Sequence, residues 1–267
     1  MSFALMESRI YIHRRKLKQT PELFNVDLGA PWELTGDWVI VGDVHTPTTE
    51  FDFAMLAAVV GRKMLKRPRR LLIAGDLFNM DSFSTYTSIV NPPTWAQERA
   101  ATKELLKAWL DTFDEVRMIL GNHDRRLQRF TAGAFETDDI LSLIISNPER
   151  VMLSNYGYCT IHSGGRKWRV THPKNYSLNQ LAVAEQLAFK SDSNVISFHE
   201  HHLALGWDRY KRYVLVNGGC LVKQKSLAYA ALDDSKSPGM ALGFVALKNG
   251  TPYLFGEEPF TDWEQWL

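Results

Sequence analysis

Three short apolar runs in the first half of the chain each end in a glycine that is followed by an aspartate or an asparagine. These are Trp38–Val41 before Gly42-Asp43, Leu71–Ala74 before Gly75-Asp76, and Val116–Leu120 before Gly121-Asn122. Short apolar runs bounded by turn residues are typical of buried strands. Glycine lets the backbone turn sharply, so the next side chain can project from the strand end. Because ligands bind outside the carboxyl ends of strands in open α/β sheets, we expect these tips to meet in one crevice.

The remaining pattern predicts helices around two sheets. Apolar residues recur at helical spacing from Phe53 to Met64 and from Leu105 to Phe113, so strands and helices alternate. The second half predicts a hairpin of 158–161 with 168–171, a helix from Leu178 to Phe189, strands at 195–198 and 213–216, and a late hairpin at Asn249-Gly250. A parallel half joined to a hairpin-rich half indicates two sheets packed face to face. With 267 residues, we expect one domain at 38–267 and an N-terminal extension, residues 1–37, packed on it.

The second half adds three histidines at predicted strand ends. His172 follows the run 168–171, and His199 and His201 follow the run 195–198. The complete set of candidate metal ligands is Asp43, His45, Asp76, Asn122, His172, His199 and His201. This is too many for one tetrahedral zinc ion and suits two ions that share a carboxylate. Nitrogen and oxygen ligands without a thiolate favour manganese, iron, zinc or nickel.

The order of these motifs resembles that of the calcineurin-like metallophosphoesterase superfamily. The motifs are Gly42-Asp43-Val44-His45, Gly75-Asp76, Gly121-Asn122-His123-Asp124, His172 and the pair His199 and His201, and the resemblance covers about residues 38 to 220. It implies a four-layer αββα sandwich of two mixed β-sheets flanked by helices, with a dinuclear metal site at the strand ends. It also implies a first ion held by Asp43, His45 and His201, and a second held by Asn122, His172 and His199. Asp76 would bridge two divalent ions, for which manganese is our first expectation.

Three positions depart from the superfamily's pattern. Asn79 stands where the second motif usually has aspartate, so metal affinity or ligand orientation can differ. Thr171 and Phe198 stand where glycine usually precedes the later histidines, which leaves the backbone path open there.

Catalytic and substrate-binding roles are expected next to the third motif. Two ions would lower the pKa of a shared water, and the resulting bridging hydroxide would attack phosphorus. His123 adjoins a ligand and is the candidate to protonate the leaving oxygen, a role that the resemblance also implies, and Asp124 could orient its ring. Arg125 and Arg126 follow, and a guanidinium matches a phosphate bidentately. A solvated helix start is the alternative interpretation of these arginines.

Composition limits the partners only weakly. The net charge of +1 gives no overall bias toward nucleic acid or membranes, and no apolar stretch approaches the length of a membrane span. With 2 cysteines and no signal-peptide pattern, we expect a cytoplasmic protein.

Three functions remain open. A phosphodiesterase acting on nucleotides or nucleic acid is our leading hypothesis. A phosphomonoesterase acting on proteins or small molecules would use the same centre, and an inactive scaffold would be expected to lose ligands. The aromatic residues around the loop 79–93, which are Phe78, Phe83, Tyr86 and Trp95, are interpreted first as packing residues and second as a lid or a base-stacking surface.

Overall fold

The computed structural model describes residues 29–84, 92–223 and 239–267. The chain divides into two units, Met1–Ala30 and Pro31–Leu267. The predicted extension therefore lies mostly outside the described residues, and Tyr86 lies outside them as well. Its end is described: residues 33–35 form a short strand of the second unit.

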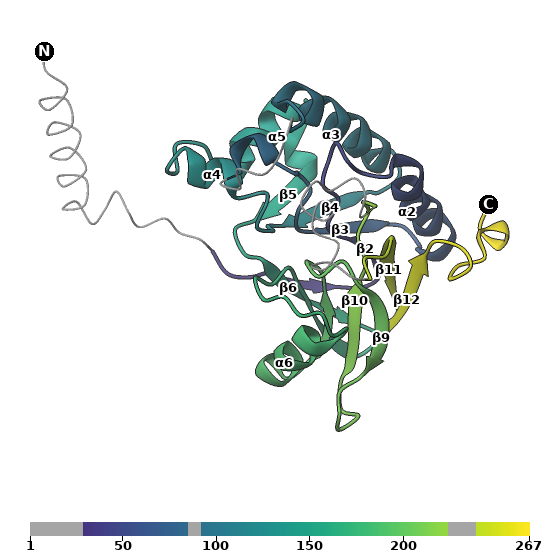
Figure 1. Cartoon of the computed structure of the whole chain (residues 1–267). Helices are drawn as coiled ribbons and strands as arrows, with labels where there is room; N and C mark the ends of the chain where they lie inside the picture. Colours follow the sequence, from purple (N-terminus) through teal and green to yellow (C-terminus); the bar gives the residue numbers. More distant parts are fainter. Residues whose placement is uncertain (1–28, 85–91, 224–238) are drawn as a thin grey trace, which may run out of the picture. The chain divides into compact units, whose positions relative to one another are not determined.

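Two six-stranded mixed sheets form the second unit (Figure 1). The first sheet has the order β12-β11-β2-β3-β4-β5, and the second has the order β1-β6-β7-β8-β10-β9. The strands of the first sheet are β2 (Trp38–Val41), β3 (Arg70–Ala74), β4 (Glu115–Ile119), β5 (Val151–Ser154), β11 (Gly243–Lys248) and β12 (Thr251–Gly256). Those of the second sheet are β1 (Glu33–Thr35), β6 (Tyr158–Ser163), β7 (Arg166–Thr171), β8 (Asn194–Ser197), β9 (Leu203–Trp207) and β10 (Val214–Gly218).

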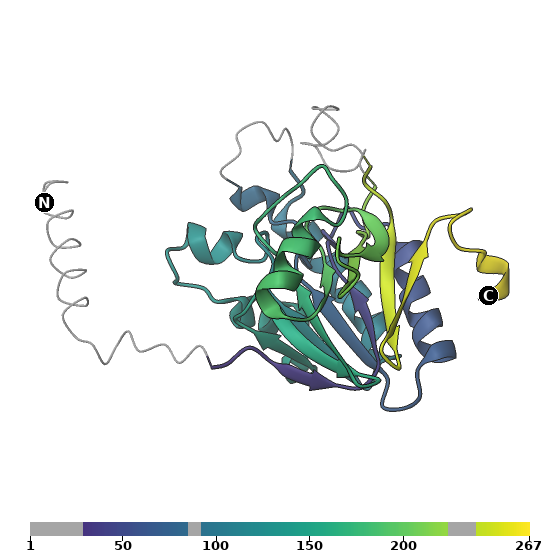
Figure 2. The same cartoon turned by 90° about the horizontal axis from the view of Figure 1, so that it is seen from below.

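The sheets stack face to face, and helices cover their outer faces. In Figure 1, α2 (Phe51–Met64), α3 (Trp95–Leu110) and α5 (Thr137–Ile144) lie on the first sheet, while α6 (Ala182–Ser191) lies on the second. Figure 2 shows α6, in green, crossing the outer face of the second sheet. The shorter helices are α4 (Arg126–Phe130), η2 (Asp81–Phe83), η3 (Pro148–Arg150) and η5 (Trp263–Gln265). This arrangement is the predicted four-layer αββα sandwich.

Strand β2 shows how its sequence produces the layers. Alternate side chains of a strand point to opposite faces of the sheet. Trp38 and Ile40 pack into the core between the two sheets, whereas Val39 and Val41 pack into the core beneath the helices. All four side chains are buried, so a continuous apolar run is what a central strand of this fold requires.

Two predicted helices differ from the observed ones. Helix α3 begins at Trp95, ten residues before the predicted start, because Thr94 and Gln97 form a capping box there. Helix α6 begins at Ala182, since Leu181 has a left-handed backbone with φ of 65°. Leu178 therefore lies outside the helix and is exposed.

The late hairpin and the first parallel strands agree with prediction. Asn249 and Gly250 both have positive φ, at 47° and 73°, as the type I′ turn between β11 and β12 requires. Strands β2, β3 and β4 are neighbouring parallel strands. No helix among the described residues is long and apolar enough to cross a membrane.

Candidate metal centre

The candidate ligands come from five loops that follow parallel strands. Strands β2, β3 and β4 are neighbours in the first sheet, and β7 and β8 are parallel neighbours in the second. The loops after these strands carry Asp43 and His45, Asp76, Asn122 to Asp124, His172, and His199 with His201. Stacking of the two sheets thus brings together residues that are more than 150 positions apart, as the hydrogen bond between His199 and Asp43 shows.

Five of the candidate ligands have a left-handed backbone. The φ angles are 49° at Asp43, 51° at His45, 52° at Asp76, 82° at His199 and 57° at His201. A left-handed conformation costs a residue with a Cβ atom roughly 1–2 kcal/mol. Such strain persists where the surrounding structure imposes it, and it gathers at functional sites. Six other non-glycine residues of the described chain also have positive φ, but five of the seven candidate ligands share this feature, which makes this region the candidate functional site.

The glycines before the ligands are required for close packing more than for turning. Of the three, Gly75 has positive φ, at 86°, which fits a sharp turn at the strand end. A Cβ atom on Gly121 would lie 2.0 Å from Asp76 Oδ1, and one on Gly42 would lie 2.5 Å from the ring of Phe198. At Gly42 and Gly121 it is therefore a residue of a neighbouring loop, Phe198 or Asp76, that needs the space.

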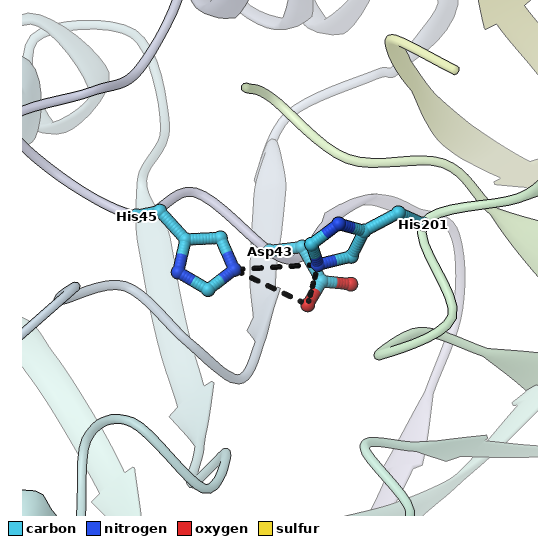
Figure 3. Close-up of side chains that lie close together, drawn as sticks. All are labelled: Asp43, His45 and His201. Atoms are coloured by element: carbon cyan, nitrogen blue, oxygen red, sulfur yellow. Dashed lines mark hydrogen bonds and ion pairs between the residues drawn. The ribbon is translucent and has the colours of Figure 1, made fainter. Parts of the chain in front are cut away.

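A first group of ligands converges from both sheets. His201 Nε2 lies 3.1 Å from Asp43 Oδ1 and 3.4 Å from His45 Nε2, and His45 Nε2 lies 3.7 Å from the same carboxylate oxygen (Figure 3). Ligands held about 2.0–2.2 Å from one ion lie roughly 3–3.5 Å from each other. The three side chains are buried, so this spacing and chemistry fit a divalent cation.

A second group lies beside the first. His172 Nε2 is 3.2 Å from Asp76 Oδ2 and 3.2 Å from Asn122 Oδ1, and His199 completes the group. His172 Nδ1 donates to the carbonyl of Ala74 at 3.0 Å, so Nε2 faces the two oxygens. Asp76 Oδ2 also lies 4.0 Å from His45 Nε2, which places this carboxylate between the two groups.

The electrostatics of the second group favour a cation. Burial lowers the pKa of His172, but the charges of Asp76 and Asp43 outweigh burial and raise the pKa to about 10. Burial raises the pKa of Asp76, and the surrounding histidines, His172 foremost, reverse this and hold the pKa far below its ordinary value. Without an ion, a proton on His172 supplies the positive charge that the carboxylates demand. A divalent ion can take over this role, so the residues fit a metal.

The ring of His123 is held by a main-chain carbonyl and an arginine. Its Nδ1 lies 2.8 Å from Asn79 O, and its Nε2 lies 3.2 Å from Arg126 Nη2. Because a carbonyl only accepts and a guanidinium only donates, Nδ1 carries the proton and Nε2 accepts. Arg126 also donates to Asn79 O and pairs with Asp81 at 2.8 Å, so it is not part of a solvated helix start.

Asp124 does not orient the His123 ring, contrary to the prediction. Its carboxylate accepts hydrogen bonds from the main-chain N–H groups of Asp76, Gly121 and Phe78. It therefore fixes the loops after β3 and β4 relative to each other. The carbonyl that orients His123 carries no side-chain signal, which is why the sequence could not identify it.

Local contacts accommodate Thr171 and Phe198, and they accommodate Asn79 in part, because its Oδ1 is buried without a hydrogen-bond partner. The Asn79 amide donates to Asp81 at 2.6 Å, so a carboxylate stands two residues later in the chain. Thr171 Oγ1 donates to Gly157 O at 3.3 Å. The Phe198 ring is buried between Gly42 and Gly218, either of which would clash with it if it carried a Cβ atom.

Arg125 is not part of the two groups of candidate ligands. It lines a pocket of about 460 Å³ together with Asn122, His172 and Lys174. Lys174 was not among the predicted residues, although its position two residues after His172 could have indicated it. Of the loop aromatics, Phe78 is fully buried, and Phe83 and Trp95 pack against the core, which agrees with their first interpretation.

Comparison with solved structures finds remote similarity in fold. Vps29 from Chaetomium thermophilum is 12% identical over 83% of this chain and 95% of its own, with a TM-score of 0.44. Vacuolar protein sorting 29 from Cryptosporidium parvum is 13% identical over 83% and 96%, with a TM-score of 0.45. A conserved protein of Streptococcus pneumoniae, described as a predicted phosphoesterase, is 10% identical over 83% and 98%, with a TM-score of 0.38.

Comparison of sequences gives the family. No curated protein matches the chain significantly. The family model of the calcineurin-like phosphoesterases matches residues 38–264, which include every candidate ligand. The chain belongs to the calcineurin-like phosphoesterase family and is a metal-dependent hydrolase of phosphate esters.

Proposed function

We propose that this hydrolase is a phosphodiesterase acting on nucleotide or nucleic-acid phosphodiesters. The observation that carries the proposal is the pocket of about 460 Å³ that opens beside Asn122 and His172. A diester has an organic group on each side of the reacting phosphate, whereas a monoester has one. A pocket that adjoins the centre gives the second group a place to bind.

Seven residues would hold two divalent ions. We assign Asp43, His45 and His201 to the first ion, Asn122, His172 and His199 to the second, and Asp76 to both. Two of the three clusters in the described residues support this assignment, the third joins His45 and Asp76 to His123, and Asn122 is included because its Oδ1 lies 3.2 Å from His172 Nε2. When bound, two such ions supply a water of lowered pKa as the nucleophile and positive charge for the transition state. We propose manganese, with iron, zinc or nickel as alternatives, because the ligands are nitrogen and oxygen atoms.

His123 and Arg126 would act on the leaving oxygen. That oxygen gains negative charge and needs a proton or a positive partner. His123 Nε2 and Arg126 Nη2 lie 3.2 Å apart, but Nε2 accepts from Arg126 here, and burial holds the pKa of His123 well below its ordinary value. Arg126 would therefore be the positive partner of the leaving oxygen, and His123 would protonate that oxygen only after taking up a proton at Nε2. The carbonyl of Asn79 holds both, and Arg125 would bind substrate from the pocket.

The two cysteines support a reducing compartment, for which we propose the cytoplasm. Cys159 and Cys220 are buried and unpaired with each other. Burial raises the pKa of the Cys159 thiol to about 12, so it stays protonated and unreactive.

Hydrolysis of two model esters by metal-stripped protein tests the function. Manganese, zinc, nickel or magnesium is restored singly, and cleavage of bis-p-nitrophenyl phosphate is compared with cleavage of p-nitrophenyl phosphate. Metal-restored cleavage of the diester is expected, and it should be lost in Asp76→Ala and Asn122→Ala. Asp138→Ala, which removes an exposed carboxylate on α5, is the matched control.

The other outcomes identify the alternatives. Cleavage of the monoester alone would replace the proposal with a phosphomonoesterase. Failure to bind any metal, together with failure to cleave either ester, would indicate a binding protein built on this fold. Unchanged activity in Asp76→Ala or Asn122→Ala would refute the assigned site.

A further inference from the structure

The pocket beside the centre is lined by candidate ligands and by cations. Asn122 and His172 belong to the candidate metal centre, while Arg125, Arg129 and Lys174 are the cations among the other lining residues. None of the described residues that line the pocket is a carboxylate. A phosphate seated in this pocket would therefore meet positive charge and no repelling acid.

The three cations are not paired with acids in the described part of the chain. Arg125 is held in place by a hydrogen bond from Nη2 to Asn155 O at 2.5 Å. Burial lowers the pKa of Arg125, the charge of Asp124 opposes this, and the smaller effects of Arg129 and Glu136 lower and raise the pKa respectively. Cations gathered in this way repel each other unless an anion joins them. The nearby acid Glu136 is bound to Gln128 at 2.6 Å and does not line the pocket.

We propose that this pocket binds a second, non-reacting phosphate of the substrate, so that the natural substrate is a nucleic-acid strand with at least two consecutive phosphates. The proposal rests on the proposed function, because it takes Asn122 and His172 as ligands of an ion that would bind the reacting phosphate beside the pocket. A guanidinium matches a phosphate with two parallel hydrogen bonds. A strand presents a charge at every nucleotide, so a phosphate that neighbours the reacting one is always available.

One exposed aromatic ring, that of Phe130, lies next to Arg129 in the chain and supports a single strand as the ligand. Phe130 follows Arg129 directly and is 70% exposed, and its ring lies 5.5 Å from that of Phe83. Proteins that bind single strands combine cations along the backbone with aromatic rings on which bases stack. A small phosphorylated metabolite would have no use for such a surface.

Thymidine oligonucleotides of different length test the proposal with metal-loaded protein. Dithymidylate contains one phosphate, and trithymidylate contains two. The value of kcat/KM for each bond cleaved should be about tenfold higher for trithymidylate, which corresponds to one additional phosphate contact. The double variant Arg129→Gln/Lys174→Gln should bring this ratio close to one.

A matched variant controls for the loss of charge. Lys103→Gln/Lys107→Gln removes two exposed lysines from α3, which line a different pocket, and should keep the wild-type ratio. A ratio near one in the wild-type protein would overturn the proposal. So would a ratio that both double variants lower equally, because general charge and not the pocket would then account for it.

Two further measurements separate this proposal from the proposed function. Hydrolysis of bis-p-nitrophenyl phosphate in the same preparations reports on the metal centre alone. If this ester is cleaved but the kcat/KM ratio of trithymidylate to dithymidylate is near one, only the second phosphate site is refuted. If no ester is cleaved, fluorescence anisotropy with labelled dithymidylate and trithymidylate still measures the affinity of the protein for each oligonucleotide. Tighter binding of trithymidylate that weakens in Arg129→Gln/Lys174→Gln would support it, and equal binding would overturn it.

Discussion

The carboxylate of Asp124 accepts a hydrogen bond from the main-chain N–H of Asp76 at 2.8 Å. The same carboxylate accepts from Gly121 at 2.8 Å and from Phe78 at 3.2 Å. Asp124 thus joins the loop that supplies Asp76 to the loop that supplies Asn122 and His123. Burial, followed by the charge of Asp76, raises the pKa of Asp124 to about 7 in the ion-free chain. We conclude that Asp124 is a positioning residue for the metal centre.

Asp124→Ala should destabilise the chain and weaken metal binding. It leaves three main-chain donors without their acceptor, and a buried donor left unsatisfied costs about 1–3 kcal/mol. We expect a lower free energy of unfolding in urea with EDTA present, and a lower affinity for Mn²⁺ by calorimetry. Asp124→Asn keeps one acceptor oxygen and should fall between. If Asp124 acted instead by orienting His123, Asp124→Ala would leave the free energy of unfolding unchanged and would shift the pH profile of kcat.

Glu98 should make stability depend on pH. Its carboxylate is buried on α3 and accepts from the Met80 N–H at 2.8 Å. Burial, opposed by this hydrogen bond, raises the pKa of Glu98 from 4.5 to about 7. The folded state therefore favours the protonated acid. Its stabilising effect is complete below pH 4.5 and is lost as the pH rises through 7, by at most about 3 kcal/mol.

Glu98→Gln tests this dependence. The amide keeps an acceptor for Met80 but cannot ionise, so the variant should be more stable than the wild-type protein at pH 8. The difference should shrink toward pH 5. Urea denaturation at both pH values measures it, with the exposed Glu104→Gln on the same helix as the control. A difference that stays constant between pH 5 and pH 8 would contradict the prediction.

The strand ends could be predicted from sequence because the candidate ligands lie within a few residues of the ends of apolar runs. Asp43, Asp76 and Asn122 come after strands whose buried residues are contiguous, and the sandwich brings them together with His172. What could not be predicted depends on the backbone and on tertiary packing. Asn79 orients His123 through its carbonyl, which no residue type encodes.

The apolar periodicity of the sequence also did not predict which face of the short helix α6 is exposed. Phe189 was one of the apolar residues from which this helix was predicted, yet it is 37% exposed, and α6 buries the smaller residues Val183, Ala184 and Ala188 instead. Small side chains give a weak periodic signal, although they allow the helix to approach the sheet closely. The short strand β1 lies within the predicted extension and pairs in parallel with β6. Three residues are too few to show any period.

The packing of Phe198 against Gly42 should appear as a coupled pair of mutations. A Cβ atom on Gly42 would lie 2.5 Å from the Phe198 ring, so Gly42→Ala should destabilise the chain by roughly 1–3 kcal/mol. Phe198→Leu should lower the free energy of unfolding less in the Gly42→Ala background than in the wild-type chain, because the smaller side chain leaves room for the methyl group. Urea denaturation of both single variants and the double variant measures the coupling. Additive losses would show that the clash is relieved elsewhere.

Metal binding should release a proton from His172. Its Nδ1 donates to Ala74 at 3.0 Å, so an ion must bind at Nε2, which the carboxylates keep protonated by raising the pKa of His172 to about 10. Mn²⁺ must displace that proton, so about one proton should be released at pH 7.5, and affinity should rise with pH. Calorimetry in two buffers of different ionisation enthalpy counts the protons. His172→Gln should reduce the count, whereas His162→Gln, which removes a half-exposed histidine paired with Glu33, should not. A binding heat that is independent of the buffer would mean that His172 is already neutral before the ion binds.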